Sequence, residues 1–286
     1  MLQPPPIVLS FAASDPTGGA GIQADMLTIA GIGCHPLSVI TAITIQDTTG
    51  VVNLMPLDAT WITAQAQIVL QDMPVRAFKL GLLGSIEIIA AIAEIVLDYP
   101  EIPLVMDPVL ASGRGDQLTD ERMIDAMREL LLPRVTVLTP NSLEARRLAQ
   151  HESDCSVSQL DLSICAQRLL NTGCKHVLIT GTHENSHNVK NTLYSAAGIR
   201  TDEWERLDAS YHGSGCTLAS AIAAQLAQGS SISDSIVKAQ QYTWQTLRAG
   251  FRPGRGQYIP DRLFRIDEQK EANSDKETPT VAFLSH

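Results

Sequence analysis

The sequence is poor in aromatic residues, has no excess of basic charge and contains no long apolar run. Only 5% of its 286 residues are aromatic, so aliphatic side chains must supply most of the core. The formal net charge of -10 disfavours nucleic acid as a partner, because patches of Lys and Arg bind a phosphate backbone. No apolar run approaches the roughly 18 residues that a membrane span needs. We therefore expect neither a membrane span nor a nucleic-acid partner.

Cysteine occurs five times, and no two cysteines form a Cys-x-x-Cys pair. An odd count without such pairs is typical of free thiols in a reducing compartment rather than of a disulfide framework or a zinc site. The first residues, Met-Leu-Gln-Pro-Pro-Pro, lack the basic start of a signal peptide. Together these features predict a cytoplasmic protein.

Apolar segments alternate with helical patterns along most of the chain, and 44% of the residues are hydrophobic. Near-continuous apolar strands alternating with helices indicate a mostly parallel sheet covered by helices on both faces. We expect a single domain over residues 1–267 and a disordered, charged tail over 268–286. The expected strands lie near 7–13, 37–45, 76–81, 103–107, 134–138 and 175–180, with an edge pair near 191–197 and 202–208. The expected helices lie near 20–32, 58–72, 85–97, 119–131, 141–150, 157–172, 214–228 and 231–249.

The segment 212–217 (His-Gly-Ser-Gly-Cys-Thr) is a glycine-rich turn that runs into a helix of small residues. Glycines let backbone N–H groups approach an anion, and the helix dipole favours negative charge there. A helix N-terminus would also favour the thiolate of Cys216. The segment therefore predicts a phosphoryl-transfer site with a built-in proton acceptor; the alternative is a tight turn with a buried cysteine.

A second glycine loop follows the first expected strand. Residues 19–24 fit the pattern G-x-G-x-x-A, and Asp47 lies 23 residues beyond Ala24. This spacing is close to a dinucleotide-binding fingerprint, in which the carboxylate binds a ribose hydroxyl. A nicotinamide-dependent oxidoreductase is therefore one interpretation. It does not explain the longer turn that begins at Asp15, nor the second glycine turn.

Two carboxylates follow expected strands. Asp107 closes one strand and Glu144 opens the helix after another, so both should lie at the carboxyl edge of the sheet, where ligands gather. Both could hold Mg²⁺, directly or through water, beside a triphosphate. The alternatives are a helix-capping role for Glu144 with Asn141, and a turn before Pro108 for Asp107.

Other catalytic patterns are absent or out of place. Residues 183–187 read H-E-x-x-H, a zinc-protease pattern that works only on a helix, but they follow an expected strand and include Asn and Ser. We expect a solvated loop there. Neither a P-loop nor a G-x-S-x-G elbow occurs.

Seven segments in order resemble the hydroxymethylpyrimidine/phosphomethylpyrimidine kinases of thiamin biosynthesis, within the ribokinase superfamily. The resemblance covers about residues 7–265 and implies an α/β fold, a ribokinase-like three-layer α/β/α sandwich with a mostly parallel central sheet. It implies an ATP- and Mg²⁺-dependent kinase, and it reassigns the first glycine loop to the substrate pocket. The segments are 14–25 (SDPTGGAGIQAD), 39–42 (VITA), 46–48 (QDT), 79–83 (KLGLL), 107–109 (DPV), 139–141 (TPN) with 144–145 (EA), and 213–217 (GSGCT).

The resemblance also implies roles for individual residues. Gln46 should read the aminopyrimidine edge, since an amide both donates and accepts hydrogen bonds. The other residues expected at the substrate are Gly19, Asp25, Leu82 and Val109. The residues expected to face ATP are Asn141, Glu144 and Thr180, with Glu144 and Asp107 at the metal. The residues expected to act in phosphoryl transfer are Gly213, Ser214 and Gly215 as the anion hole and Cys216 as the proton acceptor.

Two departures from the family pattern bear on function. Thr180 stands where the family often carries a lysine, and a threonine binds phosphate without neutralising it. Arg255 is a candidate source of the missing charge. Ala13 stands in place of a common glycine near the substrate, which would narrow the pocket.

The sequence thus predicts phosphorylation of 4-amino-5-hydroxymethyl-2-methylpyrimidine and of its monophosphate. The alternatives are a pyridoxal or pyridoxine kinase of the same fold, the oxidoreductase, and a ligand sensor in which Thr180 weakens catalysis. Apolar positions near 191–208 favour a homodimer.

Overall fold

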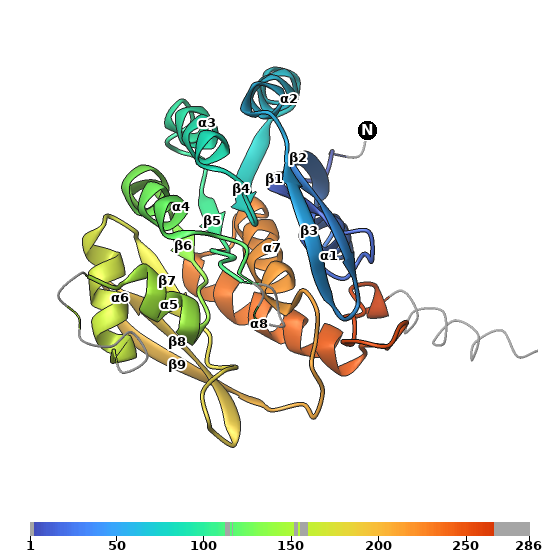
Figure 1. Cartoon of the computed structure of the whole chain (residues 1–286), viewed down its shortest axis with the longest axis vertical. Coiled ribbons are helices and arrows are strands. Elements are labelled where there is room, and N and C mark those ends of the chain that lie inside the picture. The colour runs from blue at the N-terminus through green and yellow to red at the C-terminus, as the bar shows by residue number, and fades with distance from the viewer. Residues whose placement is uncertain (1–2, 112–114, 116, 152–153, 155–159, 266–286) are drawn as a thin grey trace, which may run out of the picture.

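The computed structural model describes residues 3–111, 115, 117–151, 154 and 160–265, and strands and helices alternate along them (Figure 1). The strands are β1 (Ile7–Ser14), β2 (His35–Asp47), β3 (Gly50–Pro56), β4 (Val75–Leu80), β5 (Leu104–Met106), β6 (Val137–Leu138), β7 (His176–Ile179), β8 (Asn188–Ser195) and β9 (Gly198–Glu205). The α-helices are α1 (Gly21–Gly31), α2 (Ala59–Asp72), α3 (Ile86–Leu97), α4 (Glu121–Ala126), α5 (Ser142–Leu148), α6 (Leu162–Asn171), α7 (Ser214–Ala227) and α8 (Ile232–Arg248).

All nine strands form one sheet in the order β3-β2-β1-β4-β5-β6-β7-β8-β9. The strands from β2 to β7 in this order run parallel. At the edges, β3 pairs antiparallel with β2, and β8 pairs antiparallel with both β7 and β9. Parallel strands joined by helical crossovers bring their carboxyl ends to one edge, where ligands bind in such sheets. Asp107, Asn141 and Thr180 follow the carboxyl ends of β5, β6 and β7 on that edge.

Two apolar layers flank the sheet. One lies under α2 to α6 and contains aliphatic side chains such as Leu9, Ile89 and Leu138. The other lies under α1, α7 and α8, where alanines of α7 such as Ala221 and Ala224 pack close to the sheet. Helices on both faces of a mostly parallel sheet make a ribokinase-like three-layer α/β/α sandwich, as the sequence predicts (Figure 1).

The elements differ from expectation mainly at the sheet edges. The sequence did not predict β3, an edge strand with a mixed burial pattern that pairs only with β2. The edge pair β8–β9 exists, but it begins three to four residues earlier than expected. Residues 127–131, expected to continue a helix, form a π-helical turn, and a 3₁₀ turn follows at 132–134, where the next strand was expected to begin. The start of the helix expected at 157–172 and the expected tail at 268–286 lie outside the described residues.

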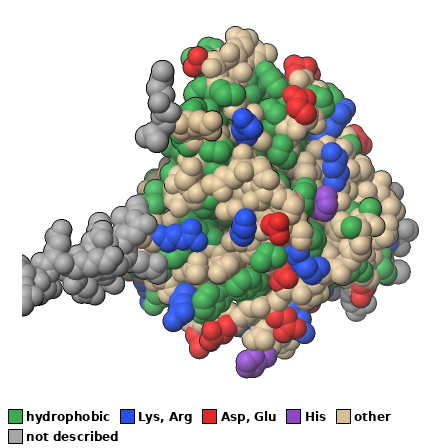
Figure 2. All heavy atoms as spheres, turned by 180° about the vertical axis from the view of Figure 1, so that it is seen from behind, with side chains coloured by type: hydrophobic (Ala, Val, Ile, Leu, Met, Phe, Trp, Pro, Cys, Tyr) green, Lys and Arg blue, Asp and Glu red, His purple; other side chains and the backbone are tan. Residues whose placement is uncertain are grey.

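Seen from behind, the surface carries basic and acidic side chains interspersed among apolar ones (Figure 2). Among the described residues, no helix combines the length and apolarity that a membrane crossing requires. The described cysteines, Cys34, Cys165, Cys174 and Cys216, are free thiols, as expected. Cys155 lies outside the described residues.

Candidate active site

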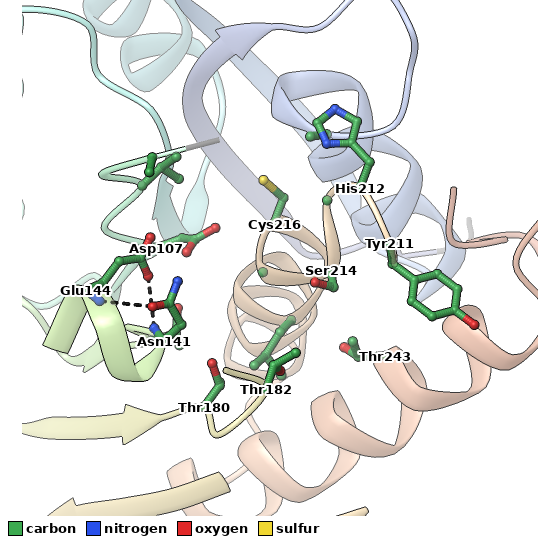
Figure 3. Close-up of a pocket in the computed structure, with 18 of the residues that line it drawn as sticks. Asp107, Asn141, Glu144, Thr180, Thr182, Tyr211, His212, Ser214, Cys216 and Thr243 are labelled. Atoms are coloured by element: carbon green, nitrogen blue, oxygen red, sulfur yellow. Dashed lines mark hydrogen bonds between the residues drawn. The ribbon is translucent and has the colours of Figure 1, made fainter. Parts of the chain in front are cut away.

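A cavity of about 980 Å³ opens at the carboxyl edge of the sheet. Its walls come from the loops after several strands, from the β2–β3 ribbon and from the N-terminus of α7. Figure 3 shows Asp107, Glu144 and Cys216 among the side chains that surround it. This volume lies at the upper end of the range for small-molecule sites, so it can hold more than one small ligand.

The turn before α7 has the geometry of an anion site. Gly213 is the N-cap of α7 with φ at 83°, a left-handed conformation that favours glycine. A Cβ on Gly213 would lie 2.0 Å from the Gly19 carbonyl oxygen, so no side chain fits. Ser214, Gly215 and Cys216 form the first turn of α7, and all three line the cavity. Their backbone N–H groups have no partner within the helix and are free to bind an anion.

Cys216 is half-buried and faces the cavity, but it is not poised as a thiolate. Burial raises the pKa of the Cys216 thiol to about 12, even though Lys79 and the Gly21 N–H lower it. The expectation that the helix N-terminus favours the thiolate is therefore wrong for the protein without ligand. Desolvation is the largest cause, and the negative charges of Asp107 and Asp25 raise the pKa further.

Asp107 and Glu144 are neighbours, and both carboxyls are hard to ionise. Burial raises the pKa of Glu144 to about 8, and the Asp107 charge acts in the same direction. Burial likewise raises the pKa of Asp107 to about 6, although Lys79 lowers it. Among the described residues no group of three or more His, Cys, Asp and Glu is placed to hold a metal ion. These two carboxylates could share a cation only with the help of ligand oxygens or water.

Glu144 also caps its helix. Its Oε2 accepts a hydrogen bond of 2.9 Å from the Asn141 N–H, while Asn141 Oδ1 accepts from the Leu143 and Glu144 N–H groups. This reciprocal arrangement is a capping box, and the sequence signal for it is confirmed. The cap fixes the carboxylate at the cavity wall beside Asp107, so the two interpretations of Glu144 are compatible (Figure 3).

The other end of the cavity is more apolar. Leu82, Val109 and Ala13 belong to one small cluster, and all three line the cavity. Gln46 lines it from β2, and its side chain hydrogen-bonds to Asp15. One amide above an apolar floor suits a flat heteroaromatic ring with a few polar edge atoms.

The first glycine loop binds its own carboxylate rather than offering N–H groups to a ligand. Asp15 accepts hydrogen bonds of 2.8 Å from the Thr17 N–H and 2.7 Å from the Ala20 N–H. Its Oδ2 also lies 2.9 Å from His212 Nε2. Asp47 does not line the cavity and accepts a hydrogen bond from the Thr49 N–H. The loop donors that a dinucleotide phosphate would need are already engaged, which argues against the oxidoreductase interpretation.

Asp25 was expected at the substrate, but the structure places it beneath the cavity. Its side chain is fully buried and pairs with Lys79, whose Nζ lies 2.7 and 2.8 Å from the two carboxylate oxygens. Ser10 and Ser220 also donate hydrogen bonds to it. Asp25 therefore holds Lys79, which lines the cavity floor, and does not itself reach the cavity.

Two further residues differ from expectation. Gly19 does not line the cavity; it supports the wall from behind, where a Cβ would lie 2.5 Å from the His212 ring. Arg255, considered as a source of charge for ATP, is exposed and does not line the cavity either. The loop at 183–187 is irregular, as expected, and Glu184 pairs with Arg146.

Residues 15–261 match the sequence profile of the phosphomethylpyrimidine kinase family. The chain belongs to this family. A hydroxymethylpyrimidine/phosphomethylpyrimidine kinase of Mycobacterium tuberculosis is 38% identical over 265 residues, which cover 92% of this chain and 95% of that protein. One of Staphylococcus aureus is 32% identical over 255 residues, covering 88% of this chain and 91% of that protein. Membership of this kinase family makes the protein a phosphotransferase.

Solved structures agree with the family assignment. A phosphomethylpyrimidine kinase of Clostridium difficile superposes with a TM-score of 0.72 at 34% identity, covering 84% of this chain and 99% of that chain. An ADP complex of pyridoxal kinase from Bacillus subtilis gives a TM-score of 0.83 at 28% identity, covering 92% of this chain and 99% of that chain. The ribokinase-like fold is therefore shared with both kinds of vitamin kinase.

The polar end of the cavity has a threonine where the resemblance to the family led us to expect a lysine. This residue, Thr180, lines the cavity wall (Figure 3) and forms an isolated β-bridge with Asn141. Arg147 and Arg206 also line the cavity. Arg206 binds the carbonyl oxygens of residues 182, 184 and 186, so it shapes the loop after β7.

Sequence reasoning missed several cavity residues of this kinase. His212 was noted only as part of the glycine motif, and Lys79 only as part of a family segment. Trp204 and Trp244 line the cavity with their ring centroids 6.4 Å apart, yet they come from β9 and α8. No spacing rule connects such distant residues; the only available signal was the scarcity of tryptophan itself, three in the chain.

Proposed function

We propose that the protein transfers the γ-phosphoryl group of ATP to the hydroxymethyl group of 4-amino-5-hydroxymethyl-2-methylpyrimidine, and then to the resulting monophosphate. One observation carries this proposal. The turn before α7, an apolar part with Gln46, and a polar part with Asn141 and Glu144 all line one cavity. A phosphoryl group at the turn would lie between its donor and its acceptor.

The apolar part of the cavity is the proposed pyrimidine site. The side-chain amide of Gln46 can donate to a ring nitrogen and accept from the exocyclic amine. Leu82 and Val109 cover the ring faces, and Ala13 narrows the floor. These residues would hold the hydroxymethyl group toward α7.

The turn itself is the proposed catalytic centre. The N–H groups of Ser214, Gly215 and Cys216 would stabilise the charge that spreads over the transferring phosphoryl oxygens. To take the hydroxymethyl proton, the Cys216 thiol would first lose its own proton to solvent, which the nearby positive charge of Lys79 favours. The thiolate would then accept the hydroxymethyl proton as the new oxygen–phosphorus bond forms and the bond to ADP breaks. Phosphoryl transfer depends mainly on position and charge stabilisation, so an acceptor that is mostly protonated at rest can suffice.

The polar part of the cavity is the proposed site of ATP and Mg²⁺. The fit is chemical: Mg²⁺ takes one or two carboxylates together with phosphate oxygens, and Asp107 and Glu144 are two such carboxylates whose mutual repulsion a cation would relieve. Bound there, Mg²⁺ would neutralise phosphate charge. Asn141 and Thr180 would donate hydrogen bonds to the nucleotide, and Arg206 would keep the loop after β7 in place.

A pyridoxal or pyridoxine kinase is the second candidate. It is favoured by one observation, the TM-score of 0.83 to a pyridoxal kinase of Bacillus subtilis. The higher sequence identity to phosphomethylpyrimidine kinases, up to 38%, favours the pyrimidine. Both substrates are six-membered heteroaromatic rings with a hydroxymethyl group, so the cavity shape does not separate them.

The test measures ADP release with Mg²⁺ and ATP on four substrates: the hydroxymethylpyrimidine, its monophosphate, pyridoxine and pyridoxal. Turnover on both pyrimidines is expected. Turnover on the pyridoxal-type substrates alone would favour the second candidate. Silence on all four would contradict a kinase role and leave a ligand sensor.

A variant sharpens the test. Gln46→Leu should raise the KM for the pyrimidine by roughly 10- to 100-fold, because the ring loses one or two hydrogen bonds. Asn53→Leu is the matched control, since Asn53 is an exposed amide on the neighbouring strand β3 and does not line the cavity.

We also propose a homodimer. The sequence favoured the strands near 191–208 as the contact, where Ile199 is 69% exposed. A larger group of exposed apolar side chains lies on the β2–β3 ribbon, at Ile43, Ile45 and Met55. That ribbon carries Gln46, so pairing of two copies there would stabilise the proposed pyrimidine site.

A further inference from the structure

Arg262 lies behind the active site, in the segment that follows α8. Its side chain is buried, with 3% of the residue exposed. The guanidinium donates hydrogen bonds to Thr217 Oγ1 at 3.0 Å, to the Gly19 carbonyl at 2.5 Å and to the Gly213 carbonyl at 3.4 Å. Longer contacts of 3.5 Å reach the carbonyls of Gly18 and Pro260. One side chain thus binds both glycine loops.

The environment of Arg262 is unusual for a buried cation. In the part of the chain that the structure describes, no carboxylate pairs with it, and all its acceptors are carbonyl or hydroxyl oxygens. Burying a charge without an opposite charge is costly, so such an arrangement indicates a specific role. The guanidinium is a rigid fork of five N–H donors, which suits the simultaneous binding of several carbonyls.

The contact with Gly213 bears directly on the anion hole. A trans peptide is planar, so the carbonyl of one residue points opposite to the N–H of the next. The Gly213 carbonyl points to the rear, where it accepts from the Thr217 N–H at 3.0 Å, from the Thr217 hydroxyl at 2.8 Å and from Arg262. The Ser214 N–H must then point forward, to the side of the cavity.

The Gly19 peptide is fixed in the same way. Arg262 holds its carbonyl, and the Ala20 N–H on the opposite side donates to Asp15. Asp15 in turn contacts His212, the residue before Gly213. The contacts close a ring from Arg262 through the first glycine loop, Asp15 and His212 back to Arg262, and this ring sets the distance between the two loops.

We propose that Arg262 is a positioning residue for phosphoryl transfer, which fixes the anion hole against the substrate loop through the Gly213 and Gly19 carbonyls. The inference rests on the proposed function. The positive charge of Arg262 lies on the same side as the N-terminus of α7 and adds to the electric field that attracts the transferring phosphoryl group. Because Arg262 does not touch the cavity, it affects the transition state more than the binding of either substrate.

The experiment compares steady-state kinetics and thermal unfolding of Arg262→Met and Arg262→Gln with the wild type. In the folded variants we expect kcat to fall about 100-fold, the effect of misplacing a catalytic donor, with both KM values within about threefold. Arg265→Met is the matched control, three residues from Arg262 in the chain. The exposed Arg265 guanidinium lies 5.4 Å from the Tyr242 ring centroid, and the kcat of this variant should not change.

The outcomes separate the two hypotheses. A folded Arg262 variant with wild-type kcat, or with only a raised KM for ATP, would overturn the positioning role. If neither variant folds, Thr217→Val decides, because it removes the hydroxyl that accepts from Arg262 and donates to the Gly213 carbonyl, the shorter of the two links between them. A kcat lowered about tenfold at constant KM supports the role, and a wild-type kcat refutes it. A wild type inactive on all four substrates would instead refute the proposed function, and this inference with it.

Discussion

His212 Nε2 lies 2.9 Å from Asp15 Oδ2, although 197 residues separate the two in the chain. The contact joins the loop after β1 to the turn before α7, so it holds the proposed substrate loop against the proposed anion hole. It also explains why Asp15 can be buried as an anion, with 2% exposure. Although burial alone would raise it, hydrogen bonds from His212, Gln46 and the Thr17 N–H hold the pKa of Asp15 well below its usual range.

Asp15→Asn should therefore destabilise the protein in a pH-dependent way. A carboxyl whose pKa is lowered by folding stabilises the protein above its unfolded pKa of about 4, and that stabilisation is lost as the pH falls below it. We expect the variant to lose about 1–3 kcal/mol at pH 7, because several donors lose their acceptor. Urea unfolding at pH 7, 5 and 3 measures this; a deficit of the same size at all three values would contradict it.

Cys216→Ala should lower turnover far more than it changes ATP affinity. Loss of a proton acceptor costs typically 10²- to 10⁴-fold in rate, and we expect a loss near 10²-fold. Cys216→Ser is the matched control for shape, since a hydroxyl is a poorer acceptor still, and it should be as slow as the alanine variant. Unchanged turnover in either variant would remove Cys216 as the acceptor.

Because burial raises the pKa of the Cys216 thiol to about 12, alkylation of Cys216 by iodoacetamide should be slow at pH 7 and accelerate as the pH rises, as followed by mass spectrometry.

Glu144→Gln should separate capping from metal binding. A glutamine oxygen can still accept from the Asn141 N–H, so the capping box survives. Folding raises the pKa of Glu144 to about 8, so its ionisation destabilises the native state increasingly from about pH 4.5 to 8. Without Mg²⁺, the variant should melt at a higher temperature than the wild type at pH 8.

The same variant should need more Mg²⁺ for half-maximal turnover, because one anionic ligand is lost. Ala145→Gly within α5 is the control, because it weakens the helix but keeps the Glu144 carboxylate. This variant should melt at a lower temperature than the wild type. An unchanged Mg²⁺ requirement in Glu144→Gln would place the metal elsewhere.

The Lys79–Asp25 pair should be costly to break from one side. Both side chains are fully buried, so Lys79→Met leaves an unpaired carboxylate and should cost about 3–5 kcal/mol. The double variant Lys79→Met with Asp25→Asn leaves no unpaired charge and should recover part of that loss. Guanidinium unfolding of the two variants measures the difference; equal losses would show that the charge pair itself is not the cause.

Substitutions on the two edges of the sheet can locate the contact of the proposed dimer. Ile45→Lys on the outward face of the β2–β3 ribbon should shift the protein to monomers, because it buries a charge in an apolar contact. Ile199→Lys on β9 is the matched variant at the other edge of the sheet and should leave the dimer intact. Sedimentation velocity distinguishes them, and the reverse result would place the contact on β9.

The sequence alone determined the layered α/β fold and the glycine turn before α7, because both depend on local patterns. Apolar runs such as the one in β1 need burial on both faces, and the glycines before α7 permit a left-handed turn that other residues resist. The capping box at Asn141 and Glu144 is equally local, and its spacing was sufficient to find it.

Only the tertiary structure decided what the charged residues do. From sequence, Asp25 and Asp15 are two nearby carboxylates, yet the first pairs with Lys79 from β4 and the second contacts the His212 ring from the turn before α7. The pKa of the Cys216 thiol is likewise set by its surroundings, since burial raises it despite the position of Cys216 at a helix N-terminus. Strand β3 escaped prediction because its pairing with β2, rather than an apolar pattern of its own, holds it in the sheet. Ionisation and pairing depend on which groups the fold brings within a few ångströms, and residue order does not encode those distances directly.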